Sequence, residues 1–559
     1  MTLIQRTGAF LLLLFCLWLP RLQIVERAVT VDEARWLLRS GNFYQALTSG
    51  NLADTYQHEQ PGVTVTWAGM LGYFWRFPDY NQLAGGQILG PTSLRNLFDE
   101  YDQSQLLVLA AGRTLVVLAL GLILMLAGLY AARLLGWLAA GLGLGLIAFD
   151  PFSLSLTYLL QPDGLASSLM LLSLLAFLAY CLAGRRRLDL LVSGLAGGLA
   201  ALSKVPALFL LPFLGLISLI WLTDPGQSVR SALHWKRSAL LLLIWAGIAG
   251  VTFAIFWPAM WVDPLGTLKE MFGQASRYAI QGNLNAVFFD GQIYASGESA
   301  WYFYPLILIW RVTPLLLGGL LLLVWRLIAA YRPGKPERMQ ASREHTARLT
   351  AGLLLLYAAL FILTISLASQ KYDRYLLPAW LALLILAGWG WAGLFDWLVG
   401  KIHGQFKQAT RLAAGLVLGV ALLAGQGLSA ARAYPYYYLY YNPLLGGLDQ
   451  AAQVLMIGWG EELDQAGQYL DTLPRPLSLR VIAWYGDGCL SYFFRGHTFN
   501  INNDTTLADL KQMDYVVTYY QQWQRQEPGP QVLGYLESLT PVHVIRVDGI
   551  DLVRIYQLR

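Results

Sequence analysis

Thr30-Val31-Asp32-Glu33-Ala34-Arg35 opens a long polar loop directly after the first apolar segment of the chain. Its two adjacent carboxylates, Asp32 and Glu33, therefore stand where a membrane helix has just ended. A carboxylate beside hydrocarbon is costly unless it is paired, solvated or used in chemistry. Two interpretations are open. Either Asp32 caps a surface helix with Glu33 in its first turn, or both acids belong to a functional site at the membrane surface.

Charged residues are scarce in the chain as a whole. Only 13% of the 559 residues are charged and 56% are hydrophobic, whereas a soluble domain typically has about 25% charged residues. The composition therefore predicts an integral membrane protein. The net charge of +5 is too modest to suggest a nucleic-acid partner. Three cysteines (Cys16, Cys181 and Cys489) are too few and too scattered for a disulfide framework or a zinc site.

Apolar runs long enough, or nearly long enough, to cross a bilayer recur along the chain; a straight span needs about 20 residues. They lie at residues 3–20, 106–130, 135–150, 157–182, 189–203, 205–222, 239–257, 303–325, 350–368, 376–398 and 412–430. No small-residue cleavage site follows the first run, so we interpret it as an uncleaved span. The sequence thus predicts a mostly α, polytopic protein with about 11 transmembrane helices.

Basic residues between the runs indicate the orientation of the chain. They fall on one side of the alternation: Arg6, Arg133, Arg185, Arg186, Arg187, Arg230, Lys236, Arg237, Arg332, Lys335, Arg338, Arg343, Arg348, Lys401, Lys407 and Arg411. By the positive-inside rule this side is the cytoplasm. In the cytoplasmic membrane, the N-terminus is then inside, and the first outer loop (residues 21–105) and the C-terminal part face outward.

With this orientation, nearly every charged residue embedded near a span end lies on the outer side. These charges are Asp150, Asp163, Lys204, Arg311, Lys371, Asp373 and Arg374. Charges at such depth are usually functional or paired with one another. One outward-facing pocket lined by both signs would explain them together. The alternative for Lys371 and Arg374 is that they extend to lipid headgroups.

The last part of the chain differs from the rest. Strand-like patterns occur at 478–484, 514–519 and 542–547, and Asp548–Gly549 predicts a hairpin turn before residues 551–557. Helical spacing covers 461–473. We therefore expect a membrane domain at 1–431 and a small extracytoplasmic α/β domain at 432–559. The aromatic segment Tyr434–Tyr441 fits either an interfacial belt or a surface that stacks on sugar rings.

Several short motifs follow Asp32–Glu33 in an order that resembles a known family. They are Gln161-Pro162-Asp163-Gly164, Ser203-Lys204-Val205-Pro206, Tyr304 with Arg311-Val312-Thr313-Pro314, Lys371-Tyr372-Asp373-Arg374, and Gly458-Trp459-Gly460-Glu461. This order is similar to that of the GT-C fold glycosyltransferases that use polyprenyl-phosphate sugars, in the branch of the protein O-mannosyltransferases and aminoarabinose transferases (glycosyltransferase family 39 type). The resemblance covers most of residues 1–430. It implies an enzyme that transfers a sugar from a polyprenyl-phosphate donor to a hydroxyl of a protein, lipid or glycan.

The resemblance also implies roles for named residues. Asp32 would be the general base that takes the acceptor proton, with inversion at the anomeric carbon. Glu33 would bind sugar hydroxyls or orient its neighbours, and Asp163 matches the second acidic position of the family. The departing phosphate needs cations, and the candidates for it are Lys204, Arg311, Lys371 and Arg374.

The first outer loop departs from the family pattern. Members often have a His-Pro pair there, but this chain has His58-Glu59-Gln60-Pro61, with Gln60 where the histidine would stand. His58, Gln60 and Tyr304 are candidate substrate contacts; a lone loop histidine is more often structural.

No cofactor is expected. The oligosaccharyl branch of this fold uses a DxD pair and a divalent ion, and the outer loops here contain no DxD pair. A divalent metal therefore stays open but unsupported, and the basic residues favour a metal-independent mechanism. Two other classes of protein stay open: a transporter or flippase for polyprenyl-linked glycans, and a binding protein of the cell envelope. A transporter should show inverted repeats, which we do not find. The one-sided placement of the charges favours the enzyme.

Overall fold

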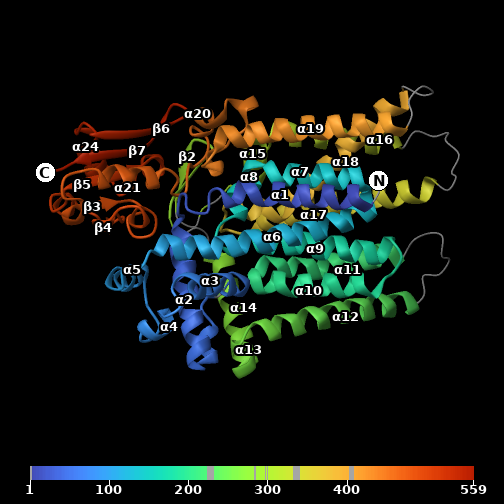
Figure 1. The fold of residues 1–559 in the computed structure, drawn as a ribbon, viewed down its shortest axis with the longest axis horizontal. Coiled ribbons are helices and arrows are strands. Elements are labelled where there is room, and N and C mark those ends of the chain that lie inside the picture. Colours follow the sequence, from blue (N-terminus) through green and yellow to red (C-terminus); the bar gives the residue numbers. More distant parts are fainter. Residues whose placement is uncertain are drawn as a thin grey trace.

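The computed structural model describes residues 3–58, 60–222, 232–281, 285–295, 298, 300–330, 340–401 and 408–559. Long helices form a bundle, and a small domain with a β-sheet lies at one end of it (Figure 1). The N-terminus lies at the opposite end of the bundle from the C-terminus (Figure 1).

The bundle helices form where the sequence has apolar runs. Their bounds are α1 (Leu3–Leu22), α6 (Gln105–Leu135), α7 (Trp137–Phe149), α8 (Pro151–Thr157), α9 (Pro162–Leu182), α10 (Arg187–Ser203), η2 (Val205–Phe209), α11 (Leu210–Leu222), α12 (Ala232–Phe256), α15 (Phe303–Arg311), α16 (Pro314–Ala330), α17 (Gln340–Leu367), α18 (Leu377–Lys401) and α19 (Gln408–Ala433). Among the described residues, 6 helices are long and apolar enough to cross a membrane, or up to 8 if each bent pair counts as one span. The polytopic helical class is confirmed, whereas the count of 11 stays a prediction.

Two pairs of consecutive helices in the bundle are sharply bent. α7 and α8 meet at 67° beside Pro151, and α15 and α16 meet at 112° beside Pro314. Proline lacks a backbone N–H and disfavours helical geometry in the residue before it, so both breaks follow from the local sequence. The run at 303–325, which we predict as one span, is therefore two steeply angled helices.

A glycine lets α18, the helix that follows the Lys371–Arg374 motif, pack closely against the backbone of α7. A Cβ atom on Gly388 would lie 2.6 Å from the Ala139 carbonyl oxygen of α7. Only glycine permits this approach, and small residues are the usual means by which membrane helices pack closely. The short helix η3 (Asp373–Leu376) continues directly into α18. The packing of α18 therefore fixes where Arg374 stands.

Basic residues mark the end of the bundle away from the sheet. Arg133, at the end of α6, pairs with Asp189 at 2.7 Å and also donates to the Ala183 carbonyl oxygen. This joins the end of α6 to the turn between α9 and α10. Five residues of the predicted cytoplasmic set lie outside the described residues: Arg230, Arg332, Lys335, Arg338 and Lys407.

Two segments between the long helices contact the C-terminal domain. Arg95 of the first donates to Thr498 at 2.6 Å, and Phe289 of the second forms an isolated β-bridge with Leu455. The first outer loop folds into α2 (Val31–Ser49), η1 (Leu52–Thr55), α3 (Val63–Arg76), α4 (Tyr80–Leu83) and α5 (Pro91–Glu100). The second contains α13 (Ala259–Val262), α14 (Pro264–Gln281) and a hairpin of β1 (Val287–Phe289) and β2 (Gln292–Tyr294). We do not predict this hairpin, although its Asp290–Gly291 turn is a strong signal for one.

The C-terminal domain contains a mixed five-stranded sheet in the order β4-β3-β5-β7-β6. Its elements are η4 (Tyr437–Leu439), η5 (Pro443–Leu445), α20 (Gly447–Ala451), α21 (Leu463–Asp471), η6 (Pro476–Ser478), β3 (Arg480–Ala483), η7 (Leu490–Tyr492), β4 (His497–Asn500), α22 (Leu507–Leu510), β5 (Tyr515–Tyr519), α23 (Tyr520–Arg525), α24 (Pro530–Glu537), β6 (His543–Val547) and β7 (Ile550–Gln557). The predicted strands and the Asp548–Gly549 hairpin are present, and β4 is an addition. The division of the chain at residue 431 stays a prediction.

Candidate active site

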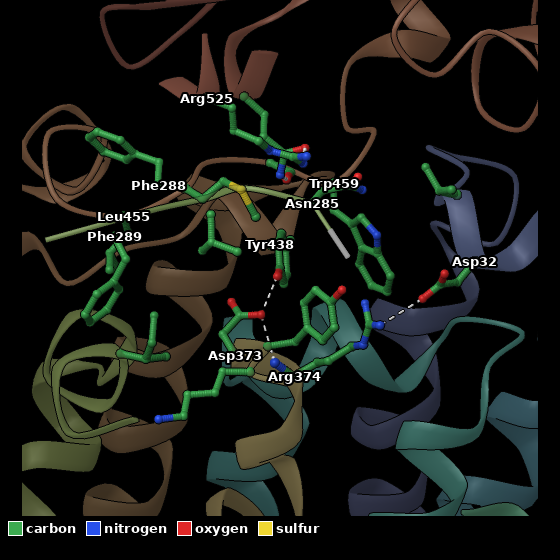
Figure 2. A pocket seen from close by; sticks show the side chains of 18 of the residues that line it. Asp32, Asn285, Phe288, Phe289, Asp373, Arg374, Tyr438, Leu455, Trp459 and Arg525 are labelled. Atoms are coloured by element: carbon green, nitrogen blue, oxygen red, sulfur yellow. Dashed lines mark hydrogen bonds and ion pairs between the residues drawn. The ribbon is translucent and has the colours of Figure 1, made fainter. Parts of the chain in front are cut away.

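A cavity of about 320 Å³ lies between the C-terminal domain and the end of the bundle nearest to it. Six parts of the chain line it: the start of α2, residues 285–289 at β1, α15, residues 371–374, the tyrosine-rich segment before α20, and the C-terminal domain. Its polar and aromatic lining includes Asp32, Arg35, Lys371, Asp373, Arg374, Tyr438, Tyr441, Trp459, Trp484, Tyr485, Gln521 and Arg525. Figure 2 shows Asp32 and Arg374 on one side of this space and Arg525 reaching toward it from the opposite side.

Asp32 and Arg374 form an ion pair in this cavity. Oδ2 of Asp32 lies 3.0 Å from Nη2 of Arg374 (Figure 2), and the two side chains are 31% and 16% exposed. Asp32 is in the first turn of α2, whose N-cap is Thr30. The interpretation of Asp32 as the cap is therefore wrong, because the helix already begins at Val31 and its cap is Thr30. The acid is held by its ion pair and still faces the cavity.

Glu33 points away from the cavity and is fully buried. Its carboxylate accepts hydrogen bonds from Arg113 (2.7 and 2.5 Å), from the Thr30 N–H (3.1 Å) and from the Leu160 N–H (2.9 Å). Arg113 is likewise buried, and it also donates to the carbonyl oxygens of Val25, Arg27 and Ala28 at 2.8 Å. These hydrogen bonds hold the start of α2 in place. Glu33 itself does not line the cavity.

Arg374 lies among aromatic rings. Its guanidinium carbon is 4.5 Å from the ring centroid of Trp459 and 4.6 Å from that of Tyr372. Glu461 supports Trp459, because its carboxylate accepts the Trp459 N–H at 2.5 Å. The Nε atom of Arg374 is buried and has no hydrogen-bond partner within the described residues. Arg374 therefore keeps a buried N–H without an acceptor among the described residues, next to the cavity that its side chain lines.

Lys371 adds a second positive charge to the lining. Its ammonium group donates to the Ala300 carbonyl oxygen at 2.7 Å. Burial lowers the pKa of Lys371. An anion beside it would oppose that shift and favour the charged form.

Asp163 and Lys204 pair with each other in a separate small recess. Their side chains meet at 2.6 Å, and the Lys204 ammonium lies 4.4 Å from the ring centroid of Tyr375. The recess of about 40 Å³ is flanked by the apolar Phe361 and Ile365. Tyr375 directly follows Arg374, so the recess adjoins the site through this residue.

Arg311 is also separate from the cavity. It is 1% exposed, pairs with Asp373 at 2.7 Å, and donates to the carbonyl oxygens of Tyr438 (2.5 Å) and Tyr440 (3.0 Å). It therefore joins the Asp373–Arg374 turn to the tyrosine-rich segment. Asp150 is buried at the α7–α8 break, where Trp380 donates to it at 2.8 Å. The expectation of one pocket lined by all the outer charges is wrong, because Asp150, Asp163, Lys204 and Arg311 do not line it.

The three candidate substrate contacts lie outside the cavity lining as well. The ring of His58 packs edge-on against Trp36 and accepts the Gln60 N–H at 3.0 Å. Tyr304 is fully buried. These contacts favour structural roles, although their part in substrate binding stays untested.

Sequence reasoning missed the contribution of the C-terminal domain. Trp484 and Tyr485 follow β3, and Gln521 and Arg525 belong to α23. Arg525 donates to Gln521 at 2.9 Å, and Tyr485 is hydrogen-bonded to the same side chain. No motif marks these residues. Within the described part of the chain, no group of three or more His, Cys, Asp or Glu side chains could hold a metal ion.

No protein-family model and no curated protein matches the chain. Solved structures do match it. ArnT from Cupriavidus metallidurans bound to undecaprenyl phosphate aligns at 14% identity with a TM-score of 0.50, covering 99% of this chain and 98% of that one. The archaeal oligosaccharyltransferase AglB from Archaeoglobus fulgidus, in complex with an inhibitory peptide and a dolichol-phosphate, aligns at 13% identity with a TM-score of 0.45, covering 97% and 73%. The likeness to ArnT shows the fold: the chain has the architecture of the GT-C membrane glycosyltransferases.

Proposed function

We propose that the protein is a membrane glycosyltransferase that moves a sugar from a polyprenyl-phosphate donor to an acceptor hydroxyl at the outer face of the membrane. The observation that supports this proposal is the Asp32–Arg374 ion pair, a carboxylate and a guanidinium side by side in one cavity; a guanidinium is a group that can bind phosphate through two hydrogen bonds. The shared fold supports this proposal, since the matching structure of ArnT contains bound undecaprenyl phosphate.

The two residues would divide the chemistry between them. The acceptor oxygen attacks the anomeric carbon and gives its proton to Asp32, while the bond from that carbon to the phosphate oxygen breaks. The polyprenyl phosphate leaves with the bonding electrons, and the anomeric carbon is inverted. Arg374 and Lys371 would stabilise the phosphate as its charge grows.

The remaining candidates fit supporting roles. Lys204 lies close to Arg374 and is held by Asp163, so it would add positive potential beside the phosphate rather than a direct bond. Arg311 would hold the Asp373–Arg374 turn in place through its bonds to Asp373 and the tyrosine-rich segment. Glu33 would position the helix that carries Asp32.

A donor-turnover assay tests the proposal. The full-length protein in nanodiscs is given undecaprenyl phosphate carrying a radiolabelled sugar, together with a membrane extract as the source of acceptors. We expect label to move to acceptor material with release of one undecaprenyl phosphate per sugar. If the donor crosses the bilayer of proteoliposomes intact and no sugar bond is broken, the protein is a transporter.

Replacing Arg374 with leucine should raise the KM for the donor. The loss of one charged contact to phosphate corresponds to about 1.5–3 kcal/mol, or roughly ten- to a hundredfold. Arg374→Lys should recover part of the loss, because lysine keeps the charge but not the two-pronged geometry. Arg495→Leu, a change at an arginine that is 64% exposed, is the matched control. An unchanged donor KM in Arg374→Leu would remove this residue from the phosphate site.

Cysteine labelling tests the proposed orientation. In a Cys16→Ser background, a membrane-impermeant maleimide should label Ser538→Cys in intact cells, because this exposed position belongs to the C-terminal domain. Arg186→Cys, at the exposed turn between α9 and α10, should react only after the cells are permeabilised. Equal labelling of both positions in intact cells would contradict the orientation.

A further inference from the structure

A second cavity of about 440 Å³ adjoins the first. The two share five lining residues, Val31, Arg35, Asn285, Trp484 and Tyr485, so they meet beside the first turn of α2. Asp32 and Arg35 are three residues apart on this helix and therefore lie on one face of it. A molecule in the second cavity can thus reach the carboxylate of Asp32 past Arg35 and Trp484.

The second cavity lies between the first outer loop and the C-terminal domain, and hydrogen bonds fasten its two walls together. Thr92, in the first turn of α5, donates to Asp487 at 3.0 Å. Arg95 of the same helix donates to Thr498 at 2.6 Å and to the Gly496 carbonyl oxygen at 2.7 Å. The walls are therefore held at a fixed separation without a ligand, which lowers the entropic cost of binding one.

The lining is rich in uncharged amides and aromatic rings. Asn285, Asn502 and Asn503 are exposed, and their side-chain amides make no hydrogen bond to any residue that the structure describes. The carboxylate of Asp487 is already occupied, since Oδ2 accepts from Thr92 and Oδ1 accepts from Thr498 at 2.8 Å. Among the described residues of this lining, Arg35 is then the one cation. An amide both donates and accepts, so three of them suit a ligand with neighbouring hydroxyl groups.

The amides, the aromatic rings and the single cation favour one of the three possible acceptors, which are a protein, a lipid and a glycan. A phosphorylated lipid headgroup would need several cations, and a lipid chain would need an apolar wall. A peptide would be recognised mainly through its main chain or apolar side chains. Sugar rings present hydroxyl groups to amides and an apolar face to tryptophan and tyrosine.

We propose that the second cavity receives the acceptor, that the acceptor is a largely uncharged glycan, and that the C-terminal domain is the part of the protein that recognises it. The inference rests on the proposed transferase function. The terminal sugar of the glycan would pass Trp484 and present one hydroxyl to Asp32. That oxygen would bond to the donor's anomeric carbon, its proton would go to Asp32, and polyprenyl phosphate would leave.

The test compares acceptors and variants in the full-length protein in nanodiscs. Undecaprenyl phosphate bearing a tritiated hexose is offered with a neutral trisaccharide panel (tri-N-acetylchitotriose, maltotriose and mannotriose), with a serine- and threonine-rich peptide, or with a phosphorylated glycolipid. The variant is Asn502→Ala/Asn503→Ala. Asn96→Ala, an exposed asparagine on α5 outside the cavity, is the matched control.

We expect label on a trisaccharide. The double variant should raise the acceptor KM by about tenfold or more, the result of losing two uncharged hydrogen bonds. Its donor KM and thermal stability should stay unchanged, and Asn96→Ala should behave as wild type. Label that goes to the peptide or to the glycolipid, with no effect of the double variant, would overturn the inference while leaving the transferase function intact.

If no donor is consumed with any acceptor, the proposed function fails. A binding measurement then tests separately whether the second cavity binds a glycan. Saturation-transfer NMR with each trisaccharide would show contact with the wild-type protein. Loss of that signal in the double variant, but not in Asn96→Ala, would support the cavity as a glycan site. No signal from any trisaccharide with the wild-type protein would overturn it.

Discussion

Asp32→Asn should lower the rate of sugar transfer by about 10²–10⁴-fold and leave the fold intact. Asparagine matches aspartate in size and can still hydrogen-bond in the first turn of α2, but it cannot accept a proton at neutral pH. The carboxylate is 31% exposed and its one ion pair is at the edge of a cavity, so the loss of charge should have little effect on stability. Purified wild type and variant are compared for transfer of labelled sugar, with thermal unfolding followed in the same preparation.

Asp54→Asn is the control for this experiment. Asp54 is an exposed acid of the same outer loop and does not line the cavity. Comparable transfer rates in wild type and a stable Asp32→Asn variant would show that the base is another group. Asp163 would then be the next acid to test, because the family resemblance assigns it the second acidic position.

Arg113→Met should destabilise the protein, because it leaves Glu33 buried without its cation. The removal of one partner of a buried ion pair typically costs about 3–5 kcal/mol. Three carbonyl oxygens that Arg113 now satisfies would also lose their donor. We expect a large fall in the apparent Tm in detergent and a parallel loss of activity, since the start of α2 would no longer be held.

The matched control is Arg76→Met, at an exposed arginine at the end of α3. The double variant Glu33→Gln/Arg113→Met should recover part of the stability, because it no longer buries an unpaired charge. A stable Arg113→Met protein with little activity would contradict this role. Glu33 would then have to act in the chemistry rather than in positioning.

Local sequence patterns predict where the site is but not how its residues are paired. Some features can be read from neighbouring residues alone. These are the apolar runs, the proline at each break, and the two acids after the first span. Arg113 illustrates the limit: it lies inside an apolar run, 80 residues from Glu33, and nothing near it in the sequence indicates a buried ion pair.

The C-terminal contribution is hidden for a similar reason. The alternation of β3 is predicted, but strand periodicity does not tell which cavity the residues after the strand will line. Trp484 and Arg525 reach the site only because the sheet domain is fastened over the first outer loop by contacts such as that of Arg95 with Thr498. Those contacts join segments about 400 residues apart in the chain.

The ion pair between Asp32 and Arg374 implies an order of events under the proposed function. While the Arg374 guanidinium is paired with the Asp32 carboxylate, the carboxylate is a weaker base toward a water molecule in the cavity. A donor phosphate would compete for the same guanidinium and release the carboxylate at the moment when a sugar is present to be transferred. Such an enzyme would bind its donor before its acceptor, because the carboxylate would be free to accept a proton only when the donor phosphate is present.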